Sequence, residues 1–203
     1  MSYAKGLTDL GNGLWAWLQP DGGWGYSNAG LITNSGESVL VDTLFDEHLT
    51  DEMLRAMEAS CGIRRDLVET VINTHANGDH THGNALLTGA EIVASEASAR
   101  EMEAFPPSLM AQLKAAGQAN LMGEAGRYFA EIFAPFDFAG VHHSAPTRTF
   151  SGTASLDVGD TRVQLLEVGP AHTAGDIVAW VPDEEVMFTG DIVEYHSACY
   201  CGD

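Results

Sequence analysis

The densest group of chemically active side chains lies in Thr74–Asn84, directly after the apolar run Val68–Asn73. Its candidate ligands are His75, Asn77, Asp79, His80 and His82. Imidazole and carboxylate groups at this density, with glycines that let the backbone turn sharply, are typical of a divalent-metal site. Because these side chains share one short loop, their spacing allows that loop to serve two ions.

Two later segments repeat the arrangement of an apolar strand followed by polar side chains. Glu167–Asp176 carries His172, and Val186–Asp191 ends on a Gly-Asp pair. An earlier apolar segment, Val39–Asp42, also ends on a carboxylate. Together with Thr74–Asn84, the two later segments give strand-end loops that carry His, Asp and Gly.

The elements that position these loops are predicted to be short strands joined by glycine turns. Apolar and β-branched runs predict strands at 14–18, 29–33, 38–42, 68–73, 91–94, 154–158, 162–168, 177–181 and 186–189. Asn34-Ser-Gly36 and Gly159-Asp160 are hairpin signals. Helical spacing covers 46–60 and 96–104. Two strand clusters separated by helical material predict two sheets packed face to face, with helices outside.

Residues 105–150 differ in character from the rest of the chain. They combine Pro106-Pro107 with methionines and with Phe129, Phe133, Phe136 and Phe138, in helical stretches broken by glycine and proline. One interpretation is an amphipathic helical insert whose aromatic rings pack on the body of the protein. The other is a mobile lid that forms an apolar wall for a substrate. The sequence favours neither.

Composition limits the classes of partner. The chain has 203 residues, and 9 Lys+Arg against 29 Asp+Glu give a net charge of −20, which repels a phosphate backbone and disfavours nucleic acid. No run approaches the roughly 20 apolar residues of a membrane span, and no secretory signal is visible, so we expect a cytoplasmic protein without a membrane partner. Three cysteines are expected to be reduced thiols. A small-molecule substrate is the expected partner, and self-association is left open.

The three strand-end loops resemble the metallo-β-lactamase superfamily. Its signature is His-x-His-x-Asp-His, then a distant Gly-x-x-His-Thr, then Gly-Asp at the end of a strand. The resemblance extends over about residues 30–195 and includes the strand that ends at Asp42. It implies an α+β fold, the αββα sandwich, formed by residues 1–203 as one domain with 105–150 as a helical insert or lid.

The resemblance also implies roles for individual residues. The metal ligands would be His75, Asn77, Asp79, His80, His172 and Asp191. His75 and His172 would belong to a first site with Asn77 in the place of a third ligand, Asp79 and His80 to a second, and Asp191 to both. One or two Zn²⁺ ions are expected, with Mn²⁺ or Fe²⁺ as alternatives. Asp79 would also be catalytic, orienting the metal-bound hydroxide.

Other polar residues are assigned to supporting positions or to substrate contact. This group is Asp42, His82, Thr173, Asp176 and His196. Asp42 would brace the His loop through backbone hydrogen bonds, while Thr173 and Asp176 would hold the shape of their own loop. His172, taken alone, is also explained as a hydrogen-bonded loop histidine, and His82 as a residue that faces solvent.

Two features depart from the superfamily pattern. Asn77 stands where a histidine is usual, and a neutral amide oxygen is a weaker ligand than imidazole for a borderline-soft ion. We therefore expect the second site to fill first. The second departure is that the final His ligand, and the closing strands and helix of the second sheet, have no counterpart before Asp203. The expectation is a fragment of a longer protein; the alternative is completion by His196 or by a partner chain.

The expected activity is hydrolysis of a small ester, thioester, lactone or amide by a metal-bound hydroxide. An alternative in another reaction class is a polyketide-type cyclase or lyase that uses the metal as a Lewis acid. A third is a truncated, inactive remnant that binds metal poorly.

Overall fold

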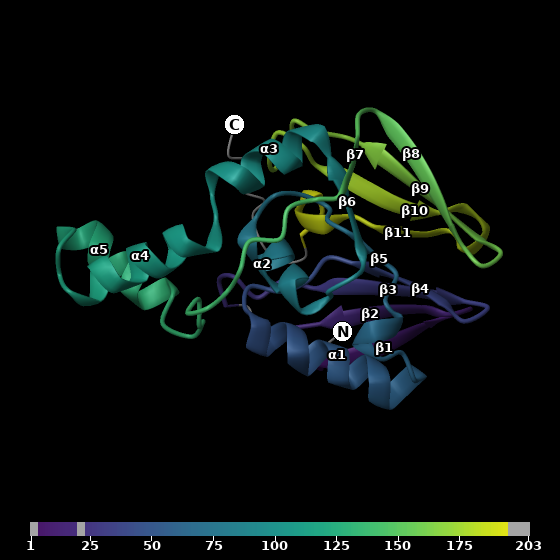
Figure 1. Cartoon of the computed structure of the whole chain (residues 1–203), viewed down its shortest axis with the longest axis horizontal. Coiled ribbons are helices and arrows are strands. Elements are labelled where there is room, and N and C mark those ends of the chain that lie inside the picture. The colour runs from purple at the N-terminus through teal and green to yellow at the C-terminus, as the bar shows by residue number, and fades with distance from the viewer. Residues whose placement is uncertain (1–3, 20–22, 195–203) are drawn as a thin grey trace.

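Two β-sheets dominate the chain, whose computed structural model describes residues 4–19 and 23–194 (Figure 1). The first sheet has seven strands in sequential order. They are β1 (Gly6–Gly11), β2 (Leu14–Leu18), β3 (Ala29–Asn34), β4 (Glu37–Val41), β5 (Thr70–Ile72), β6 (Glu91–Ser95) and β7 (Arg148–Phe150). The second has four, in the order β11-β10-β9-β8. They are β8 (Thr153–Val158), β9 (Thr161–Glu167), β10 (Ile177–Val181) and β11 (Val186–Phe188).

Strand direction explains where the His loop emerges. Strands β1 to β4 pair antiparallel, whereas β4, β5, β6 and β7 pair parallel. The carboxyl ends of β4 and β5 therefore lie at one edge of the sheet. Asp42 comes directly after β4, and Thr74-His75 comes after β5 with Asn73 between them. Both segments therefore start from this edge. The β3–β4 hairpin turns through Ser35 and Gly36, both with positive φ, as its sequence predicts.

The core lies between the two sheets and on the outer face of the first. Ile32, Val41 and Ile72 face the second sheet, where they meet Leu165 and Ile177. Adjacent positions on the same central strands, such as Leu31 and Leu40, face the opposite way and pack under a helix. Strands buried on both faces read as continuous apolar runs, which is why these segments lack polar alternation.

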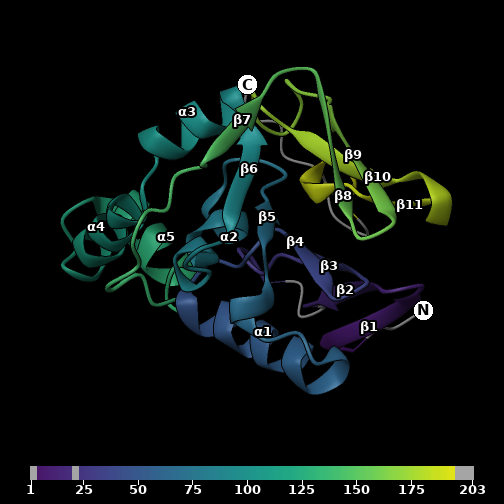
Figure 2. The ribbon, with the colours of Figure 1, turned by 45° about the vertical axis from the view of Figure 1, so that its right-hand side comes forward.

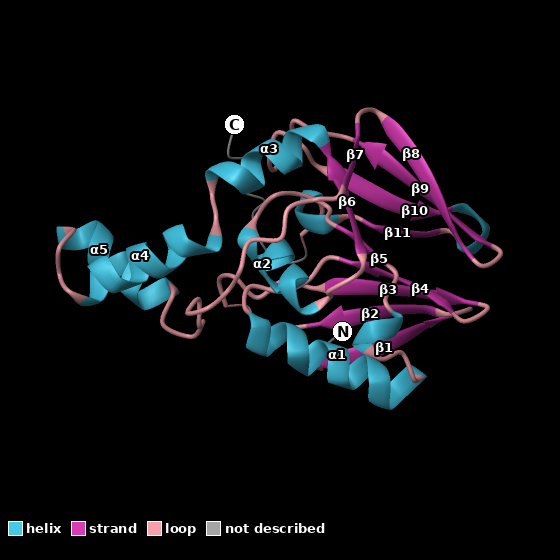
Figure 3. Cartoon of the chain, in the orientation of Figure 1, coloured by secondary structure: helices cyan, strands magenta, loops and turns pink. Residues whose placement is uncertain are grey.

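Helices cover the outer face and the site edge (Figure 3). Helix α1 (Glu47–Cys61) buries Met53, Leu54 and Met57 against the first sheet. Asp46 caps its first turn, and Gly62 ends it with a φ of 76°. The one-turn helix α2 (Gly78–Thr81) lies within the His loop, and α3 (Glu96–Ala104) starts at the Ser95 cap. The predicted helices at 46–60 and 96–104 are confirmed.

The segment after α3 forms a helical hairpin beside the sandwich (Figures 1 and 2). Helices α4 (Pro107–Gln118) and α5 (Gly123–Ile132) cross closely, and a Cβ at Gly117 would lie 2.2 Å from the Gly126 carbonyl oxygen. The following Phe133, Phe136 and Phe138 are buried against Phe45. The contacts thus match the packing interpretation of the insert.

The range 105–150 also contains a strand that the sequence did not indicate. Arg148–Phe150 pairs parallel with β6 as β7, so the chain rejoins the first sheet before it enters the second. Only three residues take part, too few for a period-two pattern to stand out. Strand β1 was likewise not specified, because its middle positions are exposed.

The predicted fold class is confirmed: the chain is an α+β protein with two packed sheets. No helix in the described ranges has the length and apolar character needed to cross a membrane.

Gly30→Ala is expected to destabilise the protein by about 1–3 kcal/mol, because the added Cβ overpacks the space between the sheets. It would lie 2.3 Å from Cε1 of Phe188 in β11. Urea unfolding of Gly30→Ala, Phe188→Ala and the double variant measures the coupling. A double variant less destabilised than the sum supports the clash, and strict additivity contradicts it.

Candidate metal centre

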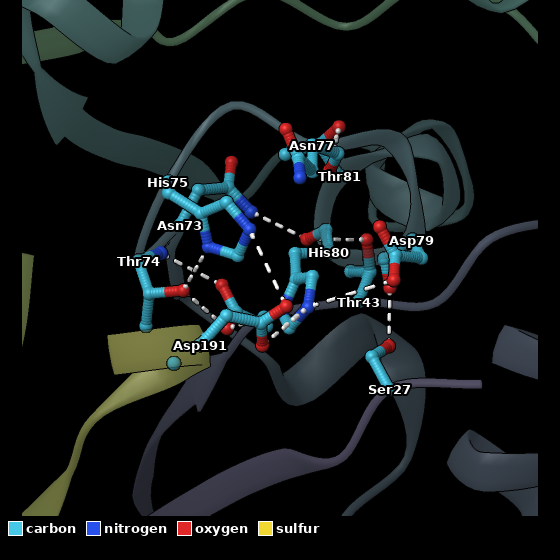
Figure 4. A network of polar contacts seen from close by, with 12 residues as sticks. Ser27, Thr43, Asn73, Thr74, His75, Asn77, Asp79, His80, Thr81 and Asp191 are labelled. Carbon is cyan, nitrogen blue, oxygen red and sulfur yellow. Dashed lines mark hydrogen bonds and ion pairs between the residues drawn. The ribbon is translucent and has the colours of Figure 1, made fainter. Parts of the chain in front are cut away.

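Four segments bring the candidate ligands together. His75 follows β5, and Asp79 and His80 lie in α2. His172 belongs to the β9–β10 connection, and Asp191 lies in the short 3₁₀ turn after β11. The two sheets thus contribute opposite sides of one cluster (Figure 4).

Three of these residues form a compact set of metal donors. One ligand atom from each of His75, His80 and Asp191 lies within 4.8 Å of the others. Nε2 of His80 is 3.1 Å from Asp191 Oδ1, and Nε2 of His75 is 4.0 Å from Asp191 Oδ2. Both Nε2 atoms are buried without a hydrogen-bond partner of good geometry. Unsatisfied buried imidazole nitrogens facing a carboxylate fit a divalent cation.

Nδ1 of both His75 and His80 contacts a polar side chain on the side away from Asp191. Nδ1 of His80 is 2.9 Å from Asp42 Oδ2, and Nδ1 of His75 is 3.0 Å from the Thr74 hydroxyl. Asp42 also accepts hydrogen bonds from the Thr74 backbone N–H and hydroxyl, each at 2.7 Å. A carboxylate behind Nδ1 fixes the tautomer in which the Nε2 lone pair is open for a metal.

His172 is placed differently from the other two histidines. Its ring centroid lies 4.9 Å from that of His75, and its Nε2 lies 3.7 Å from Asp191 Oδ2. The Asn77 side-chain amide nitrogen lies 2.9 Å from the same Nε2 atom. Asn77, the departure from the superfamily pattern, is therefore within hydrogen-bond distance of a histidine 95 residues along the chain.

Asp79 borders the compact donor set without belonging to it. Its Oδ2 is 3.8 Å from His80 Nε2, and its side chain keeps 22% of its exposure. Burial, the largest influence, raises the pKa of this carboxyl, while the nearby His80 lowers it. The Asp79 carbonyl oxygen accepts a hydrogen bond from the Ser27 hydroxyl, which joins the 23–28 loop to the His loop.

The pKa values of the two closest imidazoles in the cluster, His75 and His80, are shifted in opposite directions. Burial, together with the charge of His80, holds the pKa of His75 well below its ordinary value. Burial also opposes the charge on His80, but Asp191, Asp42 and Asp79 together raise the pKa of His80 well above its ordinary value. Burial likewise opposes the charge of Asp191, yet the neighbouring histidines, His80 foremost, lower its pKa. A negative carboxylate thus stands among nitrogen donors.

The remaining assigned residues lie around this cluster. Thr173 donates to the Asp176 carboxylate through its backbone N–H, at 2.7 Å, and its hydroxyl, at 3.0 Å. His82 points into the aromatic group, stacking on Phe45 with Nδ1 3.2 Å from the Phe45 carbonyl oxygen. Burial lowers the pKa of His82 to about 4. His196 lies outside the described residues, as do Cys199 and Cys201.

A buried amide network behind the His loop was not anticipated. Asn73 donates to the His80 carbonyl oxygen at 3.0 Å, and Asn84 donates to the Asn73 amide oxygen at 2.8 Å. The Thr43 hydroxyl completes the network through Asn84 Oδ1 at 3.0 Å. The available signal was the position of Asn73 and Asn84 at the two ends of the loop, where burial requires each amide to find a partner.

Two packed sheets that enclose a buried His/Asp cluster at the strand ends form a sandwich with a candidate metal site. Residues 22–198 match the family model described as the Metallo-beta-lactamase superfamily. The chain belongs to this superfamily, whose members are metal-dependent hydrolases.

Individual relatives are distant. The chain is 25% identical over 196 residues to a metallo-beta-lactamase type 2 from Bacillus sp. (strain 170), covering 93% of this chain and 60% of that protein. It is 25% identical over 170 residues to a protein of the same name from Bacillus cereus, covering 83% of this chain and 52% of the relative. The chain thus spans little more than half the length of these curated relatives.

Solved structures share the fold. A metallo-beta-lactamase from Pontibacter korlensis superposes with a TM-score of 0.67 at 18% identity, covering 97% of this chain and 76% of that one. Another from Hirschia baltica gives a TM-score of 0.59 at 18% identity, covering 90% and 69%. At this identity the likeness establishes the architecture alone.

Proposed function

We propose that this chain acts as a metal-dependent hydrolase on a small ester, thioester, lactone or amide, with Zn²⁺ as its ion. The observation that carries the proposal is the convergence of two unsatisfied buried imidazole nitrogens on the Asp191 carboxylate. His75, His80 and Asp191 would hold the ion. Two nitrogens and one carboxylate oxygen form a donor set that Zn²⁺ accepts, with a coordination position left for water or substrate.

A bound Zn²⁺ ion would supply a Lewis acid and lower the pKa of a bound water to about 7. The chain's own residues would orient the reactants. Asp79 stands beside His80 with 22% of its side chain exposed, and its carboxylate would accept a hydrogen bond from the attacking water. Asp42 would keep His80 in the ligating tautomer through its contact with Nδ1.

The preference for an apolar substrate rests on the loop that contacts Asp79. Trp24 precedes Ser27 by three residues and leaves 50% of its surface exposed, although its ring packs on Phe45 and Phe133. Ser27 joins this loop to Asp79 through a hydrogen bond. An exposed aromatic ring on a loop fixed next to the site offers an apolar contact surface for a substrate.

Metal removal tests the proposal. Chelator treatment followed by desalting is expected to lower kcat/KM by about 100-fold or more, since the chemistry depends on the ion, and added Zn²⁺ is expected to restore it. The substrates to assay are a p-nitrophenyl ester, an aryl thioester, a homoserine lactone and a chromogenic β-lactam. The last is included because both curated relatives carry the name metallo-beta-lactamase.

Each alternative has its own outcome in this assay. Hydrolysis that survives complete metal removal contradicts the proposal. Tight metal binding without hydrolysis of any substrate favours the cyclase or lyase class. Failure to retain metal favours the inactive remnant.

A further inference from the structure

We propose that Asn77 limits this centre to one ion by occupying Nε2 of His172, so that His75, His80 and Asp191 alone hold the metal. The inference rests on the proposed metal site and adds its stoichiometry and the residue that sets it. It differs from the sequence-based expectation, in which His172 is a ligand and one or two ions bind, the second site filling first.

The contact between Asn77 and His172 involves the atom that a metal would need. The side-chain nitrogen of Asn77 lies 2.9 Å from His172 Nε2. If Asn77 donates, the Nε2 lone pair accepts its hydrogen. If the amide is turned so that Oδ1 faces the ring, Nε2 must carry the hydrogen itself. In both orientations the lone pair is unavailable for coordination.

The other two histidines are in the opposite condition. Nδ1 of His75 contacts the Thr74 hydroxyl and Nδ1 of His80 contacts Asp42, while each Nε2 is buried without a hydrogen-bond partner of good geometry. Their unsatisfied atoms face Asp191, whose Oδ1 and Oδ2 lie 3.1 Å and 4.0 Å from them. One ion satisfies both nitrogens at once. The free energy gained by coordinating these nitrogens is larger than at His172, whose Nε2 already contacts Asn77.

A second ion would lack donors. Among the described candidate ligands, those left after His75, His80 and Asp191 are Asp79, His172 and the neutral amide of Asn77. Binding there would require Asn77 to leave His172 and would place a second divalent charge beside the first. Asp79 alone, partly exposed and 3.8 Å from His80, does not offset that repulsion.

Asn77 can be replaced without disturbing the loop backbone. Its side chain is exposed and makes no capping hydrogen bond to α2. Its carbonyl oxygen accepts the Thr81 hydroxyl at 3.1 Å and the His80 N–H at 3.0 Å, and any residue at 77 keeps both bonds. Variants at this position therefore report on the side-chain contact itself.

The test is a Zn²⁺ titration of the metal-free 203-residue chain by calorimetry, with elemental analysis after desalting. We expect one ion per chain for the wild type and two for Asn77→His, which removes the amide and adds an imidazole. His172→Ala is expected to change wild-type Zn²⁺ affinity by less than about threefold, whereas loss of a residue that supports the ion costs about tenfold or more. Co²⁺ absorption spectra of the wild type and His172→Ala are expected to coincide.

Asn77→Ala provides the matched control because it opens His172 without adding a donor. In this background His172→Ala is expected to weaken Zn²⁺ binding by about tenfold or more, while in the wild type it does not. Two ions in the wild type, or a tenfold loss on His172→Ala alone with an unchanged thermal midpoint, overturns the inference. Both readouts are taken without substrate. A failed hydrolase proposal therefore shows in the activity assay, and a failed stoichiometry proposal shows in the titration.

Discussion

Asp191→Asn is expected to lower the affinity of the chain for Zn²⁺ by about 100-fold or more and to abolish metal-dependent hydrolysis. Asp191 is the only carboxylate in the compact donor set of the described residues, and its oxygens lie 3.1–4.0 Å from Nε2 of His80, His172 and His75. The amide keeps the shape but removes the negative charge that compensates the cation. Calorimetric titration with Zn²⁺ measures the loss.

Asp183→Asn is the matched control for this experiment. Asp183 lies exposed in the β10–β11 connection, eight residues before Asp191. Its substitution by Asn removes the same charge from the protein. We expect its Zn²⁺ affinity to stay within about twofold of the wild type, because exposed charges are largely screened. Equal losses in the two variants would show that Asp191 acts through net charge rather than as a ligand.

Asp42→Asn is expected to destabilise the metal-free protein by about 2–4 kcal/mol. Asp42 is 2% exposed and contacts the Thr74 N–H, the Thr74 hydroxyl and His80 Nδ1. A carboxamide has one oxygen for these three groups and turns its N–H₂ towards the others. If that N–H₂ donates to His80 Nδ1, the ring hydrogen moves to Nε2, so Zn²⁺ affinity falls by about 10–100-fold as well.

Urea unfolding of the metal-free chain and Zn²⁺ titration measure the two effects separately. Asp157→Asn is the control: its side chain is 57% exposed and pairs with Arg162 on the surface of the second sheet. The control is expected to lose less than about 1 kcal/mol. An Asp42→Asn protein as stable as this control contradicts the bracing role of Asp42.

The strands and helices were predictable because most carry strong local signals. The Asn34-Ser-Gly36 turn, the Asp46 cap and the apolar runs of the central strands each fix structure within a few residues. The parallel edge strand β7 was not predictable, because it is short and gains its place only by pairing with β6.

The clustering of the candidate residues was predictable, but their geometry was not. Residue types and order indicated His75, His80, His172 and Asp191, and the structure brings all four into one cluster. The sequence could not show that Asn77 contacts His172, because that contact joins loops 95 residues apart whose relative placement depends on both sheets. Nor could the sequence show which histidines have an Nε2 atom available to a metal and which have Nε2 in a hydrogen bond, because hydrogen bonding depends on the folded structure.

The α4–α5 hairpin lies between two neighbouring strands of the first sheet, so it can be replaced by another segment without changing the sheet. It leaves the first sheet after β6 through α3 and rejoins it at the neighbouring β7, so its length can change while the register of both strands is kept. Its aromatic anchor, Phe133–Phe138, meets the body at Phe45, which stacks on His82. Grafting a different hairpin between these strands would alter the surroundings of the metal loop through Phe45 and through Phe138, both of which contact the His82 ring, leaving the ligands in place.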